Sequence, residues 1–472
     1  MHTSIRSSLQ NELAVGTKRK RILIAISSDL YKRNFVDSGA LSELAKAYEL
    51  CFLLSSAVKL AWPNTYCVKN DDIENRTKKR WRLQFITMKR FASRSSTFAI
   101  KYKEHLYRHL NSWNKFRFQV VSLPGIAELF VKMTEISLGT LKEVDRYLDE
   151  INPDFAIVPS GFLDSFSSDC IKSLKKRKIK HLMLMGNWDN VSSKGVLTVK
   201  PDYLGVWGEQ GKEAAIKIHQ IPSERVFILG SPQFEVYFKK VIQSKVEFCH
   251  LNQLPVDKRI LLYVGTSRWV DEIAILSHLD KAIENDELSN VHVHYRPHPW
   301  KEISSDEKNF FDCGFKYTTM DHQLIDHYQK LLTDPAYKTS RNGFMPEYSY
   351  YLSLFNAVDA VICPLTTMGI EAMIAGKPVM LHAFPNEAHN FSAADALHYE
   401  HHKAWSKMPS VLICRDRAQV VAYCQKLLTF VNAQNTSEKV RDEVRYVVHH
   451  DNSSYCERLA GCVRMMLTID NN

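Results

Sequence analysis

The sequence contains few of the residues that mark unstructured or cross-linked proteins. Glycine and proline occur only 17 and 16 times in 472 residues, below their average usage, which argues against long disordered or low-complexity tracts. The ten cysteines are scattered and none belongs to a C-x-x-C pair, so neither a zinc ribbon nor a disulfide framework is indicated. Reduced thiols of a cytosolic protein are therefore expected.

Long apolar runs are also missing. The first twenty residues, MHTSIRSSLQNELAVGTKRK, carry charged and polar groups where a secretory signal needs an apolar run. No window offers the roughly 18 uninterrupted apolar residues of a membrane-spanning helix. We therefore expect a cytoplasmic protein, with any membrane contact made at the inner face of the cytoplasmic membrane.

The sequence does contain enough apolar material for two domains. Apolar residues make up 45% of the chain, and its length exceeds one ordinary core, so we expect two domains of about 200 residues each. KRILIAISS at 20–28 and KRILLYVGTS at 258–267 share a basic start, an apolar run and small hydroxyl residues. Such runs predict buried parallel strands, followed by helices over 39–50 and 270–283.

The likeness between the two halves continues further along the chain. NPDFAIVPS at 152–160 and AVDAVICPLT at 357–366 each combine an aspartate, a short apolar run, a proline and a hydroxyl residue. Strands alternating with helices predict an α/β protein with two Rossmann-like domains facing a cleft. Further strands are expected at 48–55, 116–121, 181–185, 203–207, 225–229 and 377–382.

The domain boundary is predicted where Gly230, Ser231 and Pro232 end a strand and the sequence turns polar. We assign residues 1–235 to the N-terminal domain and 236–472 to the C-terminal domain, with the linker near 231–257. A last helix over 451–467 has possible capping residues at its start and closes the fold.

Candidate ligand-binding residues follow the predicted strands, because in an open α/β sheet reacting groups collect at the carboxyl ends. In CPLTTMGIEAMIAGKPV, residues 363–379, Thr366 and Thr367 add donors beside the free N–H groups of a helix start. Gly369 lets a ligand approach the backbone, and Glu371 accepts from ligand hydroxyls such as those of a sugar. Alternatively, the threonines only cap the helix and Glu371 complements its dipole.

A second strand end reads VHVHYRPHPW, residues 291–300. The prolines beside His298, including Pro299, restrict the backbone, so the imidazole is presented to a phosphate with little entropy left to lose, with Arg296 close by. The alternative is a proline-stiffened turn with an exposed histidine. A third strand end, GTSRW, places Thr266, Ser267 and Arg268 beside the same crevice.

A basic aromatic insertion over about 76–117 carries thirteen lysines and arginines against one acid, Glu104. Three interpretations compete: a solvated helical face, a patch for an anionic membrane surface, and nucleic-acid binding. The last is disfavoured because no nucleic-acid-binding signature accompanies the charge. The membrane and acceptor patch is assigned to Lys78, Lys79, Arg80 and Arg82.

The R-P-H-P segment and P-L-T-T-M-G-I-E-A-x-x-A-G-K-P-V resemble the second domain of GT-B glycosyltransferases. They are most similar to bacterial capsule and surface-polysaccharide enzymes of the sialyl-, Kdo- and CDP-glycerol transferase types. The segment 186–234 is also similar to the end of the first domain in relatives of such enzymes. The resemblance implies that His298 with Pro299, and Thr366 with Thr367, bind the phosphates of a nucleotide donor that is CMP-, CDP- or UDP-linked.

The resemblance further implies transfer of a sugar to a glycan or lipid-linked glycan acceptor, with a peripheral membrane contact. Retaining members of the fold often carry two glutamates eight positions apart, but Cys363 stands eight before Glu371, so an inverting mechanism is expected. An inverting transfer needs a general base from the first domain. Asp189 is chosen because the ring of Trp188 could stack on a sugar; the other candidates are Asp29, Asp37, Asp164 and Glu209.

No metal or other cofactor is predicted, since HYEHH at 398–402 lacks recognisable ligand geometry and is expected at the surface. Three other functions stay open. A phosphotransferase of the same fold would move glycerol or ribitol phosphate from a CDP-alcohol with the same contacts. A sugar-nucleotide epimerase would share the two domains but need no acceptor, and a sugar-nucleotide-binding scaffold would bind without turnover.

Overall fold

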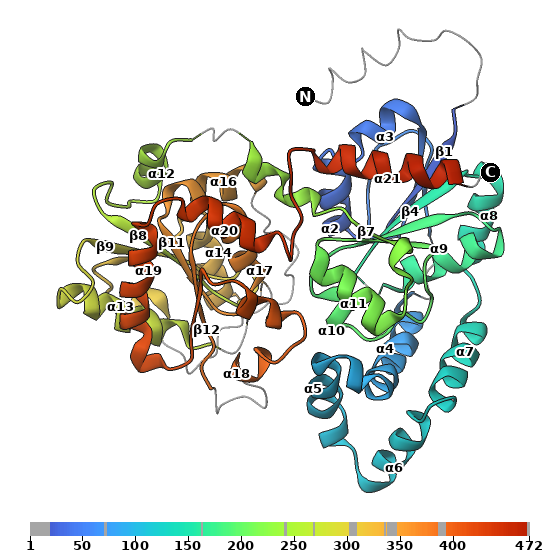
Figure 1. Ribbon diagram of the computed structural model, residues 1–472, viewed down its shortest axis with the longest axis horizontal. Coiled ribbons are helices and arrows are strands. Elements are labelled where there is room, and N and C mark those ends of the chain that lie inside the picture. Colours follow the sequence, from blue (N-terminus) through green and yellow to red (C-terminus); the bar gives the residue numbers. More distant parts are fainter. Residues whose placement is uncertain are drawn as a thin grey trace.

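The computed structural model describes residues 19–69, 73–161, 164–239, 243–267, 270–301, 309–334, 337, 347–385 and 393–469. Two α/β units lie side by side, each built around a parallel sheet (Figure 1). The predicted fold class is therefore confirmed: the chain forms two Rossmann-like domains. Within the described residues, no helix is both long enough and apolar enough to cross a lipid bilayer.

In the first domain, the described strands form a seven-stranded parallel sheet of order β3-β2-β1-β4-β5-β6-β7. Most of its strands are buried apolar runs, as expected for a parallel sheet covered on both faces. Their bounds are β1 Arg21–Ile26, β2 Glu49–Leu54, β3 Thr65–Cys67, β4 Phe155–Ser160, β5 His181–Met185, β6 Tyr203–Val206 and β7 Val226–Ile228.

The second domain repeats this plan with a sheet of six described parallel strands, in the order β10-β9-β8-β11-β12-β13. The segments that look alike in sequence, β1 and β8 and then β4 and β11, hold equivalent central positions in their sheets. The bounds are β8 Arg259–Val264, β9 Val291–Arg296, β10 Thr318–Met320, β11 Ala360–Cys363, β12 Val379–His382 and β13 Val411–Cys414.

Helices cover both faces of each sheet. In the first domain the described helices are α2 Asp29–Tyr31, α3 Ser42–Ala47, α4 Ile73–Arg90, α5 Ser96–His105, α6 Ser112–Val121, α7 Ile126–Leu138, α8 Lys142–Ile151, α9 Ser165–Lys176, α10 Asn190–Ser193 and α11 Glu209–His219. In the second they are α12 Lys245–Leu251, α13 Glu272–Glu284, α14 His322–Thr333, α16 Tyr348–Ala357, α17 Thr367–Ile374, α18 Ala393–Ala396, α19 Val420–Val431 and α20 Thr436–Val444.

The insertion between β3 and β4 is helical throughout its regular structure. Helices α5 and α7 lie on either side of α4, and α6 forms the tip of the arm that these helices extend from the first domain (Figure 1). The strand predicted at 116–121 is wrong, since this segment belongs to α6. Asn111 caps that helix, accepting from the backbone N–H of Asn114 at 2.9 Å.

The last helix, α21 Tyr455–Ile469, crosses back and lies on the first domain beside α3 (Figure 1). Leu459, Val463 and Met466 are buried there in one apolar cluster with Ile22 and Phe52 of the first sheet. The predicted boundary after residue 235 falls within a short 3-10 segment, Pro232–Phe238, that links the two sheets. By that division α21 counts with the second half, whereas its packing is with the first sheet.

Candidate functional site

The connectivity of the second sheet marks one position for a ligand. The chain runs from β8 outward to β9 and β10, then returns to β11 on the other side of β8. Loops leave β8 and β11 in opposite directions, and ligands of open α/β sheets bind at the carboxyl edge of such a switch point. Three of the predicted groups lie at consecutive strand ends here, in the order β9, β8, β11, so β9 and β11 are about 10 Å apart.

Thr366 and Thr367 occupy the start of α17, as predicted. Thr366 is extended and stands at the N-cap position, but its side chain makes no capping hydrogen bond. The capping alternative is therefore not what the structure shows, and the Thr366 hydroxyl is available to a ligand. Gly369 has another role than the predicted one, because a methyl group there would meet the Trp405 ring at 3.2 Å and the Cys363 sulfur at 3.3 Å.

The side chain of Arg296 is buried within the second domain and makes its contacts there. It forms an ion pair with Asp321 and donates to the Tyr351 hydroxyl at 3.3 Å. Its guanidinium also lies 5.3 Å from the centre of the Tyr350 ring. The predicted phosphate contact for Arg296 is therefore not supported, because a buried carboxylate already neutralises this charge.

His298 is half-buried just after β9, and its hydrogen bonding identifies its tautomer. The backbone N–H of Trp300 donates to Nδ1 of His298 at 3.0 Å. Burial, helped by Lys301 and Arg296, lowers the pKa of His298 to about 4. The ring is therefore neutral with its proton on Nε2, and among the described residues that N–H has no hydrogen-bond partner. A neutral donor facing an anion site suits phosphate.

The carbonyl oxygen of Pro299, the residue after His298, lies 2.5 Å from Nε2 of His327. This contact holds the turn that follows β9 against α14.

The end of β8 is ordered by Glu272 at the start of α13. The backbone N–H of Thr266 donates to Oε1 of Glu272 at 2.7 Å, and Tyr295 donates to Oε2 at 2.6 Å. Ser267 is half-buried beyond it. Arg268, the third predicted contact of this turn, lies outside the described residues.

Glu371 lies half-buried on the first turns of α17, where Tyr237 donates to its carboxylate at 2.6 Å. Burial raises the pKa of Glu371 to about 7, against the opposing effects of Tyr237, Arg33 and Arg296. This glutamate therefore exchanges its proton near neutral pH. Sequence reasoning assigned it only the acceptance of ligand hydroxyls, because nothing in the local pattern reveals its burial.

The first domain contributes Asp189 and Trp188, which follow β5. Asp189 accepts from the Ser193 hydroxyl at 2.7 Å, while its buried Oδ1 has no hydrogen-bond partner in the part of the chain that the structure describes. The predicted sugar-stacking role of Trp188 does not fit, since its ring is buried against His401 and Trp405 of the second domain. The expected surface position of the HYEHH segment is wrong for two of its residues, because His401 and His402 are buried.

The switch point of the first sheet, between β1 and β4, is occupied by Tyr31. Side chains added at Gly161 or Gly186 would collide with the Tyr31 ring, so the strand ends there must stay small. Burial together with the charges of Asp164 and Asp189 raises the pKa of Tyr31. Asp164, one of the other predicted bases, caps α9 by accepting from Ser167, and burial raises its pKa.

Residues after the carboxyl ends of the two sheets contact each other along a seam defined by Asn34, Trp188, Tyr348 and Thr367. The Tyr348 hydroxyl donates to Oδ1 of Asn34 at 2.5 Å, and the Arg33 guanidinium stacks 4.0 Å from the Tyr348 ring centre. The contacts of Arg33 and Asn34 with Tyr348 could not be predicted from the sequence, because no motif connects a turn after β1 with a helix over 300 residues away.

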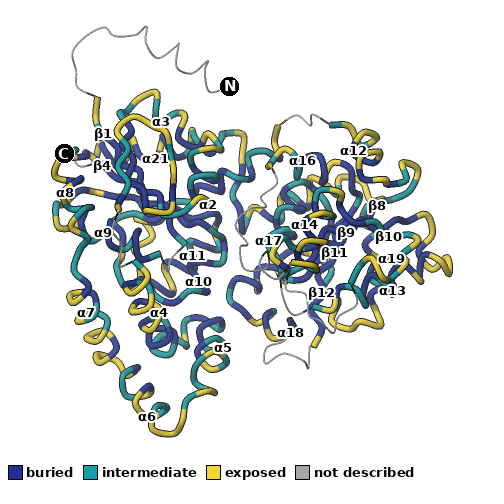
Figure 2. Tube along the Cα trace, turned by 180° about the vertical axis from the view of Figure 1, so that it is seen from behind, coloured by how far each residue is buried: buried dark blue, intermediate teal, exposed yellow. Residues whose placement is uncertain are grey.

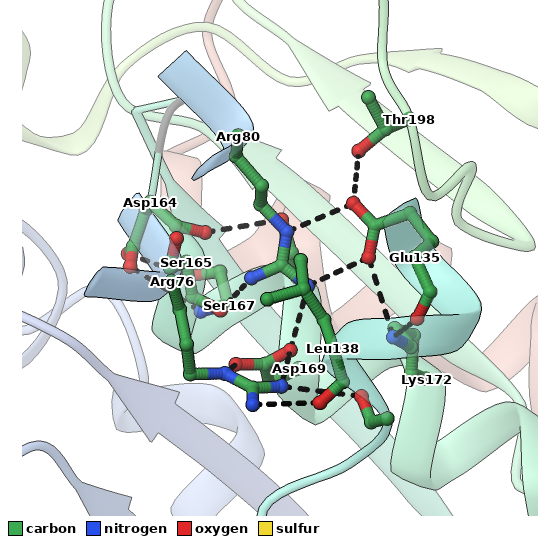
Figure 3. Close-up of polar contacts among 12 residues, drawn as sticks. Arg76, Arg80, Glu135, Leu138, Asp164, Ser165, Ser167, Asp169, Lys172 and Thr198 are labelled. Atoms are coloured by element: carbon green, nitrogen blue, oxygen red, sulfur yellow. Dashed lines mark hydrogen bonds and ion pairs between the residues drawn. The ribbon is translucent and has the colours of Figure 1, made fainter. Parts of the chain in front are cut away.

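The predicted basic patch on α4 divides into two groups. Lys78, Lys79 and Arg82 are exposed, and Lys78 pairs with Glu74 at 2.6 Å. Arg80 is buried and binds Glu135 and Asp169 at 2.8 and 2.7 Å (Figure 3), so its assignment to the surface patch is wrong. The spacing of charged and apolar residues along α4 could not predict the burial of Arg80, because the two acids that pair with it come from other helices.

Comparisons with known proteins are informative at the level of fold. No family model and no curated protein matches the chain. A putative UDP-N-acetylglucosamine 2-epimerase from Listeria monocytogenes is 8% identical, with a TM-score of 0.50 over 95% of this chain and 97% of that one. The UDP-N-acetylglucosamine 2-epimerase from Rickettsia bellii is 11% identical, with a TM-score of 0.50 over 96% and 98%.

The wall teichoic acid polymerase TagF is 12% identical, with a TM-score of 0.47 over 97% of this chain and 91% of that one. Identities this low establish the architecture alone. The chain has the GT-B fold, with two Rossmann-like domains whose sheets meet along their carboxyl edges, as the resemblance of its motifs implied.

Among the described residues, no cluster of histidine, cysteine, aspartate and glutamate side chains could hold a metal ion.

Proposed function

We propose that the protein is a glycosyltransferase that moves a sugar from a CMP-, CDP- or UDP-linked donor to a glycan or lipid-linked glycan acceptor in surface polysaccharide synthesis. The observation that carries the proposal is the Nε2–H of His298, two strands away from the Thr366 hydroxyl and the N–H groups that start α17; among the described residues neither that N–H nor that hydroxyl has a side-chain hydrogen-bond partner. Together they form a donor-rich edge suited to a phosphate.

The proposed transfer inverts the anomeric carbon and needs no metal or other cofactor. The acceptor hydroxyl oxygen attacks the anomeric carbon while the bond from that carbon to the phosphate oxygen breaks. The bonding electron pair leaves with the nucleotide, where the imidazole N–H of His298 and the α17 amide groups stabilise the added charge. The acceptor proton passes to Asp189, whose Oδ1 lacks a hydrogen-bond partner among the described residues. Because that oxygen is buried, the acceptor reaches it only when the seam opens.

A peripheral membrane contact belongs to the same proposal. Lys78, Lys79 and Arg82 are exposed along α4 and could attract an anionic surface at the inner face of the cytoplasmic membrane. Because such attraction is screened within about 10 Å at 0.1 M salt, binding to anionic vesicles through this patch should weaken as salt rises.

The proposed nucleotide site can be tested by measuring which nucleotide binds. In a thermal-shift panel of CMP, CDP, UDP and GDP, the tight binder raises the melting temperature by mass action. A shift with at least one nucleotide that disappears in His298→Ala supports the site. A shift that persists unchanged in this variant removes His298 from it.

Turnover then separates the reactions. Nucleotide release that requires an added acceptor supports a transferase, and a product carrying a phosphodiester instead of a glycosidic bond identifies polyol phosphate transfer. Rearrangement of the sugar nucleotide without an acceptor would contradict the proposal in favour of an epimerase.

A further inference from the structure

A cavity of about 1060 Å³ lies in the first domain, away from the candidate site. It is open to solvent and is bounded by α4, α7, the end of α9, the end of α11 and the segment 196–200. Helices α9 and α11 precede β5 and β7, so their last residues lie at the amino edge of the sheet. The cavity is therefore at the edge opposite the seam.

The lining of this cavity carries an excess of positive charge. Seven lysine and arginine side chains line it among the described residues, against Glu128 and Glu135. Both carboxylates are already engaged, Glu128 with Arg90 at 2.9 Å and Glu135 with Arg80 at 2.8 Å. Four of the lysines have no hydrogen bond or ion pair within the part of the chain that the structure describes: Lys132, Lys175, Lys176 and Lys200.

These cations repel one another in the absence of an anion. Burial, together with the charges of Arg94 and Lys175, lowers the pKa of Lys200. A bound anion would counter that repulsion and stabilise the charged form of Lys200. The positive charge of the cavity lining therefore favours binding of a negatively charged group.

The floor of the cavity is fixed by a network of buried charges (Figure 3). Arg80 joins Glu135 of α7 to Asp169 of α9, and Thr198 donates to Glu135 at 2.8 Å. Burial opposes ionisation of Glu135, but the Arg80 hydrogen bonds outweigh it and lower its pKa to about 2. The helices that carry the free lysines are consequently held in place.

Apolar side chains also line the cavity. Phe91, Val131 and Ile218 line it, as does Ile136 of α7. Ile136 also belongs to a stripe of exposed apolar side chains along α7, spaced three or four residues apart. Its members are Ile126, Leu129, Phe130, Met133 and Ile136, which are 42% to 62% exposed.

The neighbouring helix α6 carries a further exposed apolar pair, the rings of Trp113 and Phe116, which stack with their centres 5.8 Å apart. The outer face of α6 and α7 is largely exposed in Figure 2. Aromatic and aliphatic side chains beside exposed lysines are the combination that binds the interface of an anionic bilayer.

We infer that this cavity binds the phosphate-bearing headgroup of an anionic membrane phospholipid, while the α7 stripe and the α6 aromatic pair enter the acyl region of the same leaflet. Charge selects the headgroup and apolar burial holds the arm on the membrane. The inference does not depend on which reaction the opposite edge carries out, because the two sites share no residue.

The test measures binding of the full chain to vesicles of phosphatidylglycerol with phosphatidylcholine, and to phosphatidylcholine alone, by flotation. Lys175→Gln with Lys176→Gln and Lys200→Gln should weaken binding to anionic vesicles roughly tenfold or more. Phe130→Ser with Met133→Ser should weaken it comparably and also reduce its resistance to salt. The matched control Lys281→Gln with Lys426→Gln and Lys439→Gln, exposed on the second domain, should leave binding unchanged.

Other outcomes would overturn the inference. Equal losses in the control and cavity variants would mean attraction by net charge alone. A thermal shift with glycerol 3-phosphate that is lost in the cavity variant, without vesicle binding, would assign the cavity to a soluble phosphate. If the stripe variant instead abolishes a dimer seen by sedimentation and leaves flotation intact, the stripe is an interface with a second copy. Unchanged circular dichroism and melting of each variant guard against misfolding.

Discussion

The indole N–H of Trp188 donates to the Oγ1 of Thr367 at 3.3 Å, which connects the loop after β5 of the first domain to the first turn of α17 in the second. The hydroxyl that the sequence assigned to phosphate binding is therefore also a point of attachment between the domains.

This relationship predicts a measurable coupling. Trp188→Phe and Thr367→Val should each lower the free energy of unfolding, and their effects should not add, because one hydrogen bond of about 0.5–1.5 kcal/mol is lost in either variant. Chemical denaturation of the two single variants and the double variant measures this coupling. Strictly additive effects would show that the contact contributes nothing.

Replacement of His298 by alanine should weaken binding of the nucleotide about 10- to 100-fold, since one hydrogen bond to a charged phosphate is worth about 1.5–3 kcal/mol. Isothermal titration of the best nucleotide from the thermal-shift panel measures the loss. His250→Ala, at an exposed position on α12, is the matched control and should bind like the unmodified protein. Equal binding by both variants would argue against the phosphate site.

Removing the charge of Asp321 should destabilise the second domain strongly. Asp321→Asn leaves the buried guanidinium of Arg296 without its counter-charge, which costs about 3–5 kcal/mol. Urea denaturation should show this loss, while Asp326→Asn on the exposed face of α14 should be near neutral. A small effect at Asp321 together with lost nucleotide affinity would restore Arg296 as a ligand contact.

Stability should fall on acidification well before the carboxylates titrate. Burial lowers the pKa of five histidines from 6.5 to about 4: His219, His292, His294, His298 and His402. Between those pH values the unfolded chain binds protons that the folded chain does not, so this stabilisation is complete above pH 6.5 and lost as the pH falls toward 4. Each buried histidine contributes at most about 1.4 kcal/mol per pH unit.

Melting temperatures from pH 7.5 to 5 measure this dependence. Glu371 acts in the opposite sense, because its raised pKa favours the folded state at low pH and that contribution is lost as the pH rises through 7. His294→Asn should flatten the profile and His250→Ala should not. A melting temperature that is constant to pH 5 would contradict the prediction.

The hydrogen bond from Tyr237 stabilises the ionised carboxylate of Glu371. Tyr237→Phe removes this bond and should therefore raise the pKa of Glu371 further. Nucleotide binding or turnover that depends on ionised Glu371 should then require a higher pH. Profiles recorded from pH 6 to 9 would show the shift, and Glu371→Gln should remove the corresponding titration. An identical profile in the Tyr237 variant would mean that Glu371 does not control the reaction.

Ten of the thirteen described strands were predictable, because continuous apolar runs have few alternatives to burial between two helical layers. The strands β3, β10 and β13 were not predicted; each is only three or four residues long and lies at the edge of its sheet. The structure of the segment 116–121 was not predictable either, since FRFQVV has the aromatic and β-branched residues of a strand yet is capped as a helix by Asn111. Positions of the candidate site followed from strand ends, so His298 and Thr366 were found. The partners of Arg296 and Arg80 come from other elements, and local patterns carry no information about such pairings.

The return of α21 to the first sheet has a consequence for synthesis of the chain. While the ribosome is still making the second domain, Ile22 and Phe52 lack the helix that will shield them, because α21 follows that domain in the chain. Throughout synthesis of the second domain, the first domain therefore keeps an apolar flank open to water, where chaperones or neighbouring nascent chains can attach.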